Sequence, residues 1–171
     1  MEKTANFVGK PLLWRSAALL RAEYELRSDD LVVAVLRFRS AWGTFATAES
    51  GDGCWTFKRV GFWQTRATIR ACDSEEEIAT FKNNTWTAGG TLVFPDGRQY
   101  PANTNFWQTQ YEFTTEAGEP LIHFRNRGLF GNSAEVTILP AAKEVTELPW
   151  MVCLGWYLIV MMQNDTAAAA S

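Results

Sequence analysis

Apolar and polar residues alternate with a period of two along most of this chain. Between Leu31 and Arg39, four apolar side chains fall on one face of the segment and two arginines fall on the other. Alternation of this kind is typical of a strand with one buried face. The apolar face carries Val32, Ala34, Leu36 and Phe38, and the opposite face carries Arg37 and Arg39.

Turn-forming residues separate the alternating segments. A Pro-Asp-Gly sequence at residues 95–97 predicts the clearest hairpin of the chain, over residues 92–100. Segment Leu12–Arg21 is compatible with a helix opened by Pro11 or with a strand, and we favour the strand. We count about ten to twelve short strands in total, a density that predicts a sandwich or a barrel.

The sequence Phe-Trp-Gln-Thr occurs twice, at residues 62–65 and at residues 106–109. The residues that follow each copy predict a hairpin with the same apolar face. The opposite face changes its charge between the copies, which predicts that it faces solvent. We favour the interpretation that the repeat reflects two hairpins that pack against the core in the same way. The alternative is a ligand-binding motif shared by both copies. The matched apolar positions are Ala67, Ile69, Ile78 and Phe81 in the first copy and Tyr111, Phe113, Leu121 and Phe124 in the second.

A run of fifteen residues near the end of the chain, Leu148–Met162, carries no charge. Glu147 and Pro149 suit the first turn of a helix, because a proline is tolerated there and an acid favours the helix dipole. The run ends at Gln163. We expect the alanine-rich residues 164–171 to form a flexible tail.

A helix that is apolar on every side belongs either in a membrane or in the middle of a protein. Fifteen residues span roughly 22 Å, which is short of the ~30 Å hydrocarbon layer of a bilayer. Trp156 and Tyr157 lie near the middle of the run, whereas membrane spans place such rings at their ends. The sequence therefore predicts a helix enclosed by the sheet. A tail anchor and an external helix on a sandwich are the alternatives.

Length and charge agree with one globular domain. The chain has 171 residues, of which 47% are hydrophobic and 20% are charged, and this balance fits a single domain with its own core. We place an N-terminal extension at residues 1–11 and a barrel domain at residues 12–163, with its central helix at residues 148–162, and we expect a monomer. The net charge of −3 argues against a nucleic-acid partner, which requires a broad basic surface.

The cysteines indicate no disulfide framework. Cys54, Cys72 and Cys153 are odd in number and widely spaced, and no pair has the spacing of zinc ligands. Cys153 falls within the apolar run, which predicts that it is a small buried hydrophobe. This usage is typical of the reducing cytoplasm, and no signal peptide is visible. We expect a cytoplasmic protein that is peripheral at the membrane if it contacts lipid.

Few residues suit catalysis. His123 is the only histidine, and the repeat places it on the outward face. No serine lies in a G-x-S-x-G motif, and Ala88–Gly90 matches neither a phosphate loop nor a dinucleotide fingerprint. The acidic run Asp73–Glu77 lacks the central glycine and the spacing of an EF-hand, and it predicts a solvated turn. We expect no enzymatic activity, no cofactor and no metal site.

Basic residues gather in the first repeat hairpin, with one tryptophan among them. Arginine is suited to bidentate phosphate contact and tryptophan to a membrane interface, so an anionic lipid headgroup is the ligand that this cluster fits best. Ordinary surface charge paired with nearby acids is the alternative. The candidate binding residues are Lys58, Arg59, Trp63, Arg66 and Arg70, with Arg37 and Arg39 nearby if their strand is adjacent.

Four stretches and the order of the elements carry a likeness to a known superfamily. The stretches are Ala46–Val60, Gly90–Arg98, Glu119–Phe124 and Leu148–Met162. The chain resembles the tubby-like C-terminal domain superfamily, in particular the LURP-one-related group, with phospholipid scramblases as more distant relatives. The resemblance implies a mostly β fold, namely a closed antiparallel β-barrel of about twelve strands that encloses one hydrophobic C-terminal α-helix.

The same resemblance bears on function. Tubby domains bind phosphoinositide headgroups through basic residues, whereas many LURP-one-related proteins have no known ligand. No tubby lipid site can be matched here residue by residue. We predict a non-catalytic binding module with anionic phospholipid as its candidate ligand. A structural or regulatory domain that acts through an unidentified protein partner is one alternative, and a tail-anchored membrane protein is another.

Overall fold

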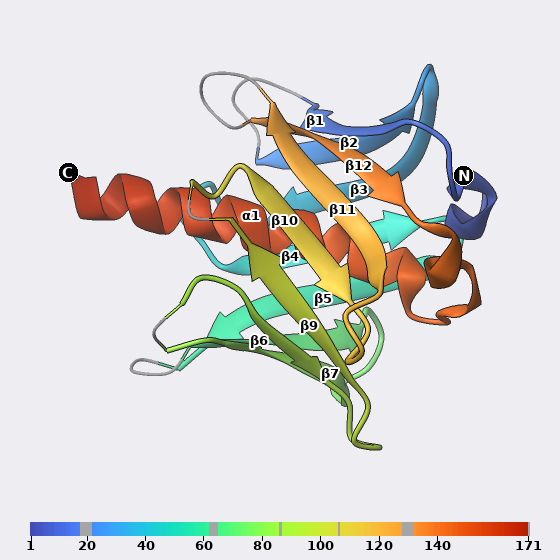
Figure 1. The fold of residues 1–171 in the computed structure, drawn as a ribbon. Coiled ribbons are helices and arrows are strands. Elements are labelled where there is room, and N and C mark those ends of the chain that lie inside the picture. The colour runs from blue at the N-terminus through green and yellow to red at the C-terminus, as the bar shows by residue number, and fades with distance from the viewer. Residues whose placement is uncertain (18–21, 62–64, 86, 106, 128–131, 171) are drawn as a thin grey trace.

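The computed structural model describes residues 1–171 except for 18–21, 62–64, 86, 106, 128–131 and 171. Twelve antiparallel strands form a closed barrel, and the helix α1 (Leu148–Ala170) runs along its interior (Figure 1). The predicted fold class is therefore confirmed. The strands are β1 (Leu12–Ser16), β2 (Glu23–Ser28), β3 (Leu31–Phe38), β4 (Phe45–Ser50), β5 (Gly53–Val60), β6 (Arg66–Ala71), β7 (Glu77–Asn83), β8 (Gly90–Val93), β9 (Gln99–Thr104), β10 (Gln110–Thr114), β11 (Pro120–Arg127) and β12 (Ser133–Ile138).

Each strand pairs with the next strand in the sequence, and β12 returns to pair with β1. The barrel therefore has no unpaired edge. Because neighbouring strands run in opposite directions, the C-terminal ends of β1, β3, β5, β7, β9 and β11 all lie at one end of the barrel. The helix α1 leaves the barrel at this end (Figure 1), which we call the helix-exit end.

Burial follows the predicted alternation, with one local shift. Ala34, Leu36 and Phe38 of β3 are buried as expected. Val32 is only half-buried, and Val33 is buried in its place. The cause is a β-bulge, because Ala34 pairs with Leu26 and Val32 pairs with Arg27, which leaves Val33 as the extra residue. The strand expected over Leu12–Arg21 is confirmed for Leu12–Ser16, which form β1, and residues 18–21 of that prediction lie outside the described residues.

The two repeat copies form matching hairpins. Ala67 of β6 pairs with Phe81 of β7, and Tyr111 of β10 pairs with Phe124 of β11 at the corresponding position. All eight matched apolar residues are buried except Ile78, which is partly buried against the core. The outer face is less uniformly solvated than predicted: Arg66 and Gln110 are exposed, whereas Thr68 and Thr114 are buried.

The apolar part of α1 fills the lumen of the barrel. Its side chains from Trp150 to Met161 are all buried, and aromatic rings of the wall pack against them. The rings of Trp14 and Trp156 are stacked with their centroids 6.2 Å apart, and those of Phe38 and Tyr157 are stacked at 5.6 Å. Such contacts add to the free energy gained from burial of apolar area.

Glycine is required at one position of α1. The ring of Phe124 lies against Gly155 so closely that an added Cβ would collide with it. The wall and the helix are therefore fitted to each other at the level of single atoms, as expected of a close-packed interior.

The helix continues beyond its predicted end at Met162. Residues 163–170 are helical although most of them are exposed, so the helix extends over residues 164–170 of the segment that we expected to be a flexible tail. Alanine has the highest helix propensity, and the enclosed turns supply the nucleus from which the helix extends. Within the described ranges, no helix has both the length and the hydropathy that a bilayer crossing requires.

The N-terminal extension is part of the packed unit rather than a separate segment. Thr4–Phe7 form a short 3-10 helix, and Phe7 belongs to the hydrophobic core. The backbone N–H of Thr4 donates a hydrogen bond of 2.8 Å to the carboxylate of Asp52, in the turn between β4 and β5. A second 3-10 helix, Pro140–Glu144, leads from β12 into α1.

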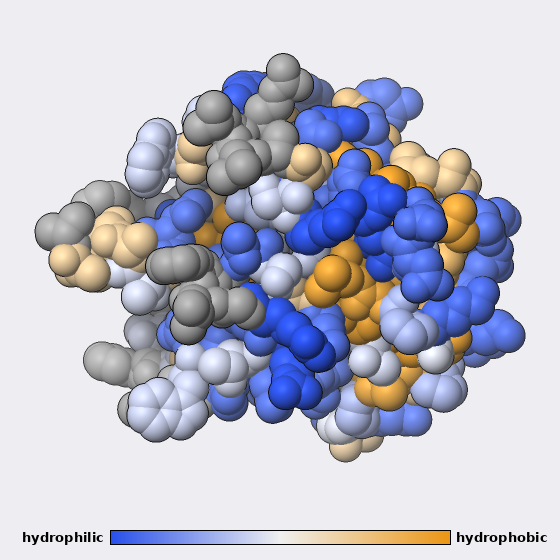
Figure 2. Space-filling view, turned by 90° about the horizontal axis from the view of Figure 1, so that it is seen from above, coloured by the Kyte–Doolittle hydropathy of each residue, from blue (hydrophilic) through white to orange (hydrophobic). Residues whose placement is uncertain are grey.

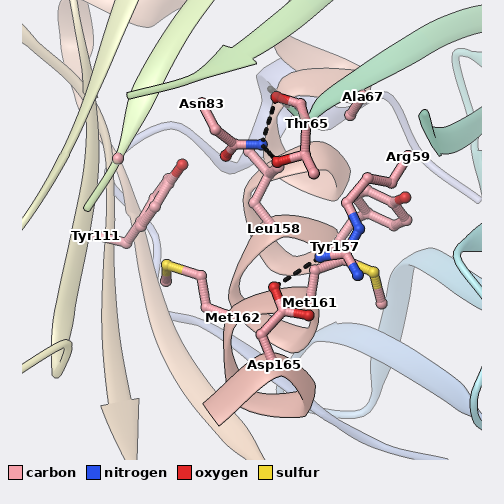
Figure 3. A pocket seen from close by; sticks show the side chains of 11 residues that line it. Arg59, Thr65, Ala67, Asn83, Tyr111, Tyr157, Leu158, Met161, Met162 and Asp165 are labelled. Carbon is pink, nitrogen blue, oxygen red and sulfur yellow. Dashed lines mark hydrogen bonds and ion pairs between the residues drawn. The ribbon is translucent and has the colours of Figure 1, made fainter. Parts of the chain in front are cut away.

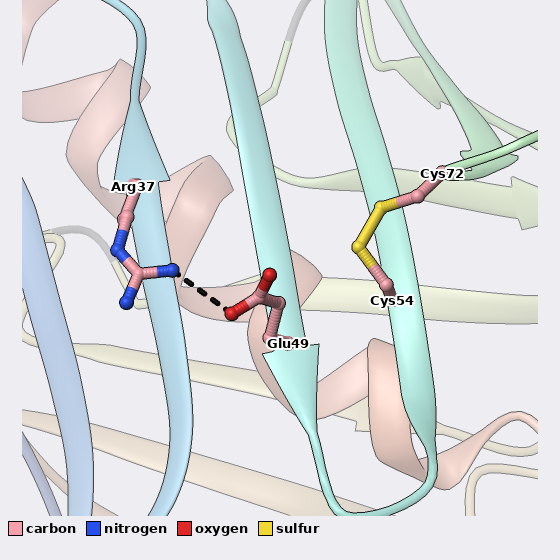
Figure 4. The surroundings of a disulfide bond; sticks show 4 residues. All are labelled: Arg37, Glu49, Cys54 and Cys72. Carbon is pink, nitrogen blue, oxygen red and sulfur yellow. Dashed lines mark hydrogen bonds and ion pairs between the residues drawn. A yellow bond between two sulfur atoms is a disulfide. The ribbon is translucent and has the colours of Figure 1, made fainter.

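The expectation that the chain has no disulfide is wrong. Cys54 and Cys72 are joined by a disulfide bond, with their Cα atoms 5.4 Å apart (Figure 4). Their separation in sequence looks long, but pairing of Trp55 with Ala71 brings them together across the β5–β6 hairpin. The bond removes the argument for a reducing cytoplasm that rested on cysteine usage. Cys153 is buried and unbonded, as predicted.

Loss of the Cys54–Cys72 bond is expected to lower the free energy of unfolding by roughly 3 kcal/mol, because the bond closes a loop of modest length in the unfolded chain. Urea unfolding of the C54S/C72S variant measures the change. Wild-type protein treated with reductant is expected to unfold at the same urea concentration as the variant, and reductant is expected to leave the variant unchanged. Identical midpoints for oxidised and reduced wild type would show that the bond contributes nothing.

Candidate functional site

Strand β5 divides the predicted basic cluster between the two sides of the barrel wall. Phe57 points into the core, so Lys58 points outward and Arg59 points inward at the helix-exit end. Arg59 forms an ion pair of 2.6 Å with Asp165 of α1. Of the proposed residues that the structure describes, Lys58 and Arg59 therefore do not share one site.

Arg70 is already neutralised by its own hairpin. Its guanidinium lies 3.2 Å from the carboxylate of Glu75 and 3.4 Å from that of Glu77. Both acids belong to the acidic run Asp73–Glu77, which leads from the turn after β6 into the first residue of β7. For Arg70, the alternative of ordinary paired surface charge is the one that the structure supports.

Arg37 is paired in the same way on the neighbouring part of the wall. It contacts Glu23 on one side and Glu49 on the other, at 3.1 and 2.9 Å (Figure 4 shows the contact with Glu49). The hydrogen bond to Glu49 raises the pKa of the Arg37 guanidinium above its ordinary value. The charge of Arg37 is thus neutralised by two neighbouring carboxylates, so this side chain is a poor candidate for binding an anionic ligand.

A second group of basic residues stands on the outer face near the helix-exit end, and we call it the outer basic face. Arg66 of β6 lies directly opposite Lys82 of β7, and Lys58 lies on the adjacent strand β5. The guanidinium of Arg39 stacks on the ring of Phe45 at 4.2 Å, and Phe45 pairs with Lys58. None of these four residues forms an ion pair with another residue in the described part of the chain. The outer basic face consists of Arg39, Lys58, Arg66 and Lys82.

Two tryptophans are exposed in the described loops. Trp42, between β3 and β4, is 92% exposed, and Trp107, between β9 and β10, is 78% exposed. Both loops follow odd-numbered strands and therefore lie at the helix-exit end. On the face that Figure 2 shows, hydrophilic residues are interspersed with apolar ones. Trp63, the tryptophan of the predicted cluster, lies outside the described residues.

A small cavity of about 70 Å³ opens inside the mouth of the barrel, beside Arg59 (Figure 3). Leu158, Met161 and Met162 of α1 form its apolar side. The polar side chains around it come from four strand ends and from the helix. They are Arg59, Thr65, Asn83, Tyr111 and Asp165, with Tyr157 beside them.

Two tyrosines of this mouth differ in their hydrogen bonding. The hydroxyl of Tyr157 donates a 2.6 Å hydrogen bond to the carbonyl oxygen of Thr44. The hydroxyl of Tyr111 donates to no described residue, although the residue is only 3% exposed. Burial raises the pKa of both hydroxyls above their ordinary value, so both remain neutral and able to donate.

The sequence indicated only part of these arrangements. Lys82 was missed, although the hairpin register places it opposite Arg66. His123 lies on the outer face between Glu112 of β10 and Thr137 of β12, as an ordinary strand residue. Among the residues that the structure describes, no group of three His, Cys, Asp or Glu side chains is placed to hold a metal ion.

No protein-family model matches the chain. No curated protein matches it either. Among solved structures, it is similar to the protein AT5G01750 of Arabidopsis thaliana, with a TM-score of 0.58 over 94% of this chain and 96% of that one. That protein has the LURP/tubby-like fold, and this chain shares its barrel and its C-terminal helix. Because only 10% of the residues are identical, this likeness concerns the LURP/tubby-like fold alone.

The two mouth tyrosines make a matched pair for a stability test. Tyr157→Phe is expected to lower the free energy of unfolding by about 1–3 kcal/mol, because it leaves the partly buried carbonyl of Thr44 without its donor. Tyr111→Phe removes a hydroxyl with no such partner, and is expected to change stability by less than about 0.5 kcal/mol. Urea unfolding of both variants measures the difference. Equal losses for the two variants would contradict the hydrogen-bond assignment.

Proposed function

We propose that this protein is a non-catalytic LURP/tubby-like module of the LURP-one-related group that binds anionic membrane surfaces through the outer basic face. The observation that carries the proposal is the pairing of Arg66 with Lys82. Like charges directly opposite each other in a sheet are unfavourable, and an anionic surface relieves their repulsion. The other arginines of this part of the wall, Arg37 and Arg70, already have acidic partners.

The magnitude fits weak, reversible attachment. Each basic residue held near an anionic leaflet contributes about 1 kcal/mol, so four residues contribute on the order of 4 kcal/mol. Trp42 follows Arg39 in the same loop, and an exposed indole is suited to the interfacial layer of a bilayer. The protein is therefore peripheral in this proposal, and its attachment weakens as salt rises.

We favour a peripheral module over the tail-anchor alternative because of where the apolar segment lies. The segment that would serve as the anchor, Leu148–Met162, lies within the barrel and is almost wholly buried by the wall. Its exposure to lipid would require the barrel to open. A regulatory domain that binds a protein with an acidic surface remains the competing proposal, since it would use the same residues.

Vesicle binding tests the proposal. Wild-type protein is expected to sediment with vesicles that contain phosphatidylserine and not with pure phosphatidylcholine, and added salt is expected to release it. The K58E/R66E/K82E variant is expected to lose roughly 100-fold or more in affinity. Lys143→Glu, an equal change of charge per residue at the opposite end of the barrel, is the control and is expected to bind like the wild type.

Two outcomes would contradict membrane binding. The first is a wild-type protein that ignores phosphatidylserine vesicles at low salt. The second is a triple variant that binds as well as Lys143→Glu. Capture of an acidic protein that depends on the same three residues, without vesicle binding, would favour the regulatory alternative.

A further inference from the structure

The cavity at the mouth of the barrel is surrounded by hydrogen-bond donors. Arg59 uses one Nη of its guanidinium for Asp165, and its other N–H groups have no hydrogen-bond partner in the described ranges. The Nδ2 of Asn83 donates to the hydroxyl oxygen of Thr65 at 2.9 Å, which leaves the hydroxyl hydrogen of Thr65 available to donate. The Tyr111 hydroxyl adds a third donor.

Tyr111 is the observation that points to a ligand. This residue is only 3% exposed and lines the cavity, and its hydroxyl has no hydrogen-bond partner among the described residues. The hydroxyl is not among the polar atoms that are both fully buried and unpartnered, so it is open to the cavity and free to donate there. A ligand atom in the cavity can act as its acceptor.

The only acid at the cavity, as far as the structure describes it, comes from the end of α1. Asp165 is 56% exposed and forms an ion pair with Arg59 beside the cavity (Figure 3). The helix beyond it is exposed, so few contacts hold this carboxylate in place. An ion pair this exposed is weak, and a bidentate oxyanion binds an arginine fork more strongly than a single carboxylate oxygen does.

We propose that the mouth of the barrel is a binding site for a phosphate monoester, and that Asp165 occupies its arginine until the ligand displaces it. The phosphate takes the fork of Arg59 and accepts hydrogen bonds from the hydroxyls of Tyr111 and Thr65. The volume of about 70 Å³ has room for a few water molecules or for one tetrahedral phosphate group. The apolar side formed by Leu158 and Met161 carries no competing charge.

This site is separate from the outer basic face. Arg59 points into the mouth, whereas Lys58, Arg66 and Lys82 point away from the barrel. The phosphate monoester can be free in solution or can be the headgroup of a lipid such as phosphatidic acid. The site does not depend on the membrane proposal, because a soluble phosphate would bind it equally.

NMR titration with inorganic phosphate tests the site. Amide signals of β5, β10 and the end of α1 are expected to shift in the wild type. Asp165→Asn is expected to bind up to about fivefold more tightly, because the competing carboxylate is gone. Arg59→Gln is expected to weaken binding at least about tenfold and Tyr111→Phe about tenfold, since each removes a hydrogen bond to a charged acceptor. Arg59→Lys keeps the charge without the fork and is expected to fall between wild type and Arg59→Gln.

Arg37→Gln is the matched control, because it removes an arginine with acidic partners on the outer wall. It is expected to leave the phosphate affinity unchanged, as is the K58E/R66E/K82E variant. Failure of vesicle binding with intact phosphate binding would thus overturn the membrane proposal alone. The mouth site is overturned if phosphate shifts neither wild type nor Asp165→Asn, or if Arg59→Gln binds like the wild type.

Vesicles distinguish the two sources of phosphate. A preference for phosphatidic acid over phosphatidylserine that disappears in Arg59→Gln would identify a lipid headgroup as the ligand. Equal binding to both lipids, with soluble phosphate still dependent on Arg59, would identify a free phosphate monoester.

Discussion

The whole structure depends on burial of one uncharged helix inside a wall of strands from the same chain. Each large side chain that α1 places in the lumen contributes about 1.5–3 kcal/mol relative to exposure. Small barrels are filled by the side chains of their own strands, and wider barrels leave a space. In this barrel residues 148–161 fill the space. The twelve strands of the wall can therefore close without leaving an empty centre.

The same burial determines where a ligand can bind. With α1 in the lumen, the binding surfaces left to the protein are the outer wall and the mouth from which the helix emerges. Because side chains alternate along β5, Lys58 lies on the outer wall and Arg59 lies in the mouth, although they are adjacent in sequence. Two electrostatic environments result. On the wall, like charges face each other at Arg66 and Lys82, and in the mouth Arg59 is covered by the end of the helix.

Much of this architecture follows from patterns that act locally. Alternation predicted the strands, the absence of charge predicted the enclosed helix, and the repeat predicted two matching hairpins, because each depends on neighbours within one element. The register of a hairpin also follows from its turn. Register could therefore have predicted two pairs that the hydrophobic pattern did not: Lys82 opposite Arg66, and Cys54 beside Cys72. The helical tail was likewise indicated by its alanines.

The missed features of the candidate site depend on contacts between distant parts of the chain. Arg59 and Asp165 are 106 positions apart, and no periodicity relates them. Whether an arginine is neutralised is decided by the strands on either side of it. Arg37 illustrates this, since its two acids come from β2 and β4. Sequence could name the basic residues but could not say which of them already had partners.

The most direct test of the account is truncation before α1. A chain that ends at residue 147 lacks the helix that fills the lumen. A chain that ends at residue 165 keeps the enclosed part of the helix, and the described residues that it lacks, 166–170, are exposed. The account predicts that the longer chain unfolds cooperatively as a monomer, and that the shorter chain is insoluble or lacks cooperative unfolding. A chain of residues 1–147 that remains monomeric and unfolds in a single cooperative transition would contradict it.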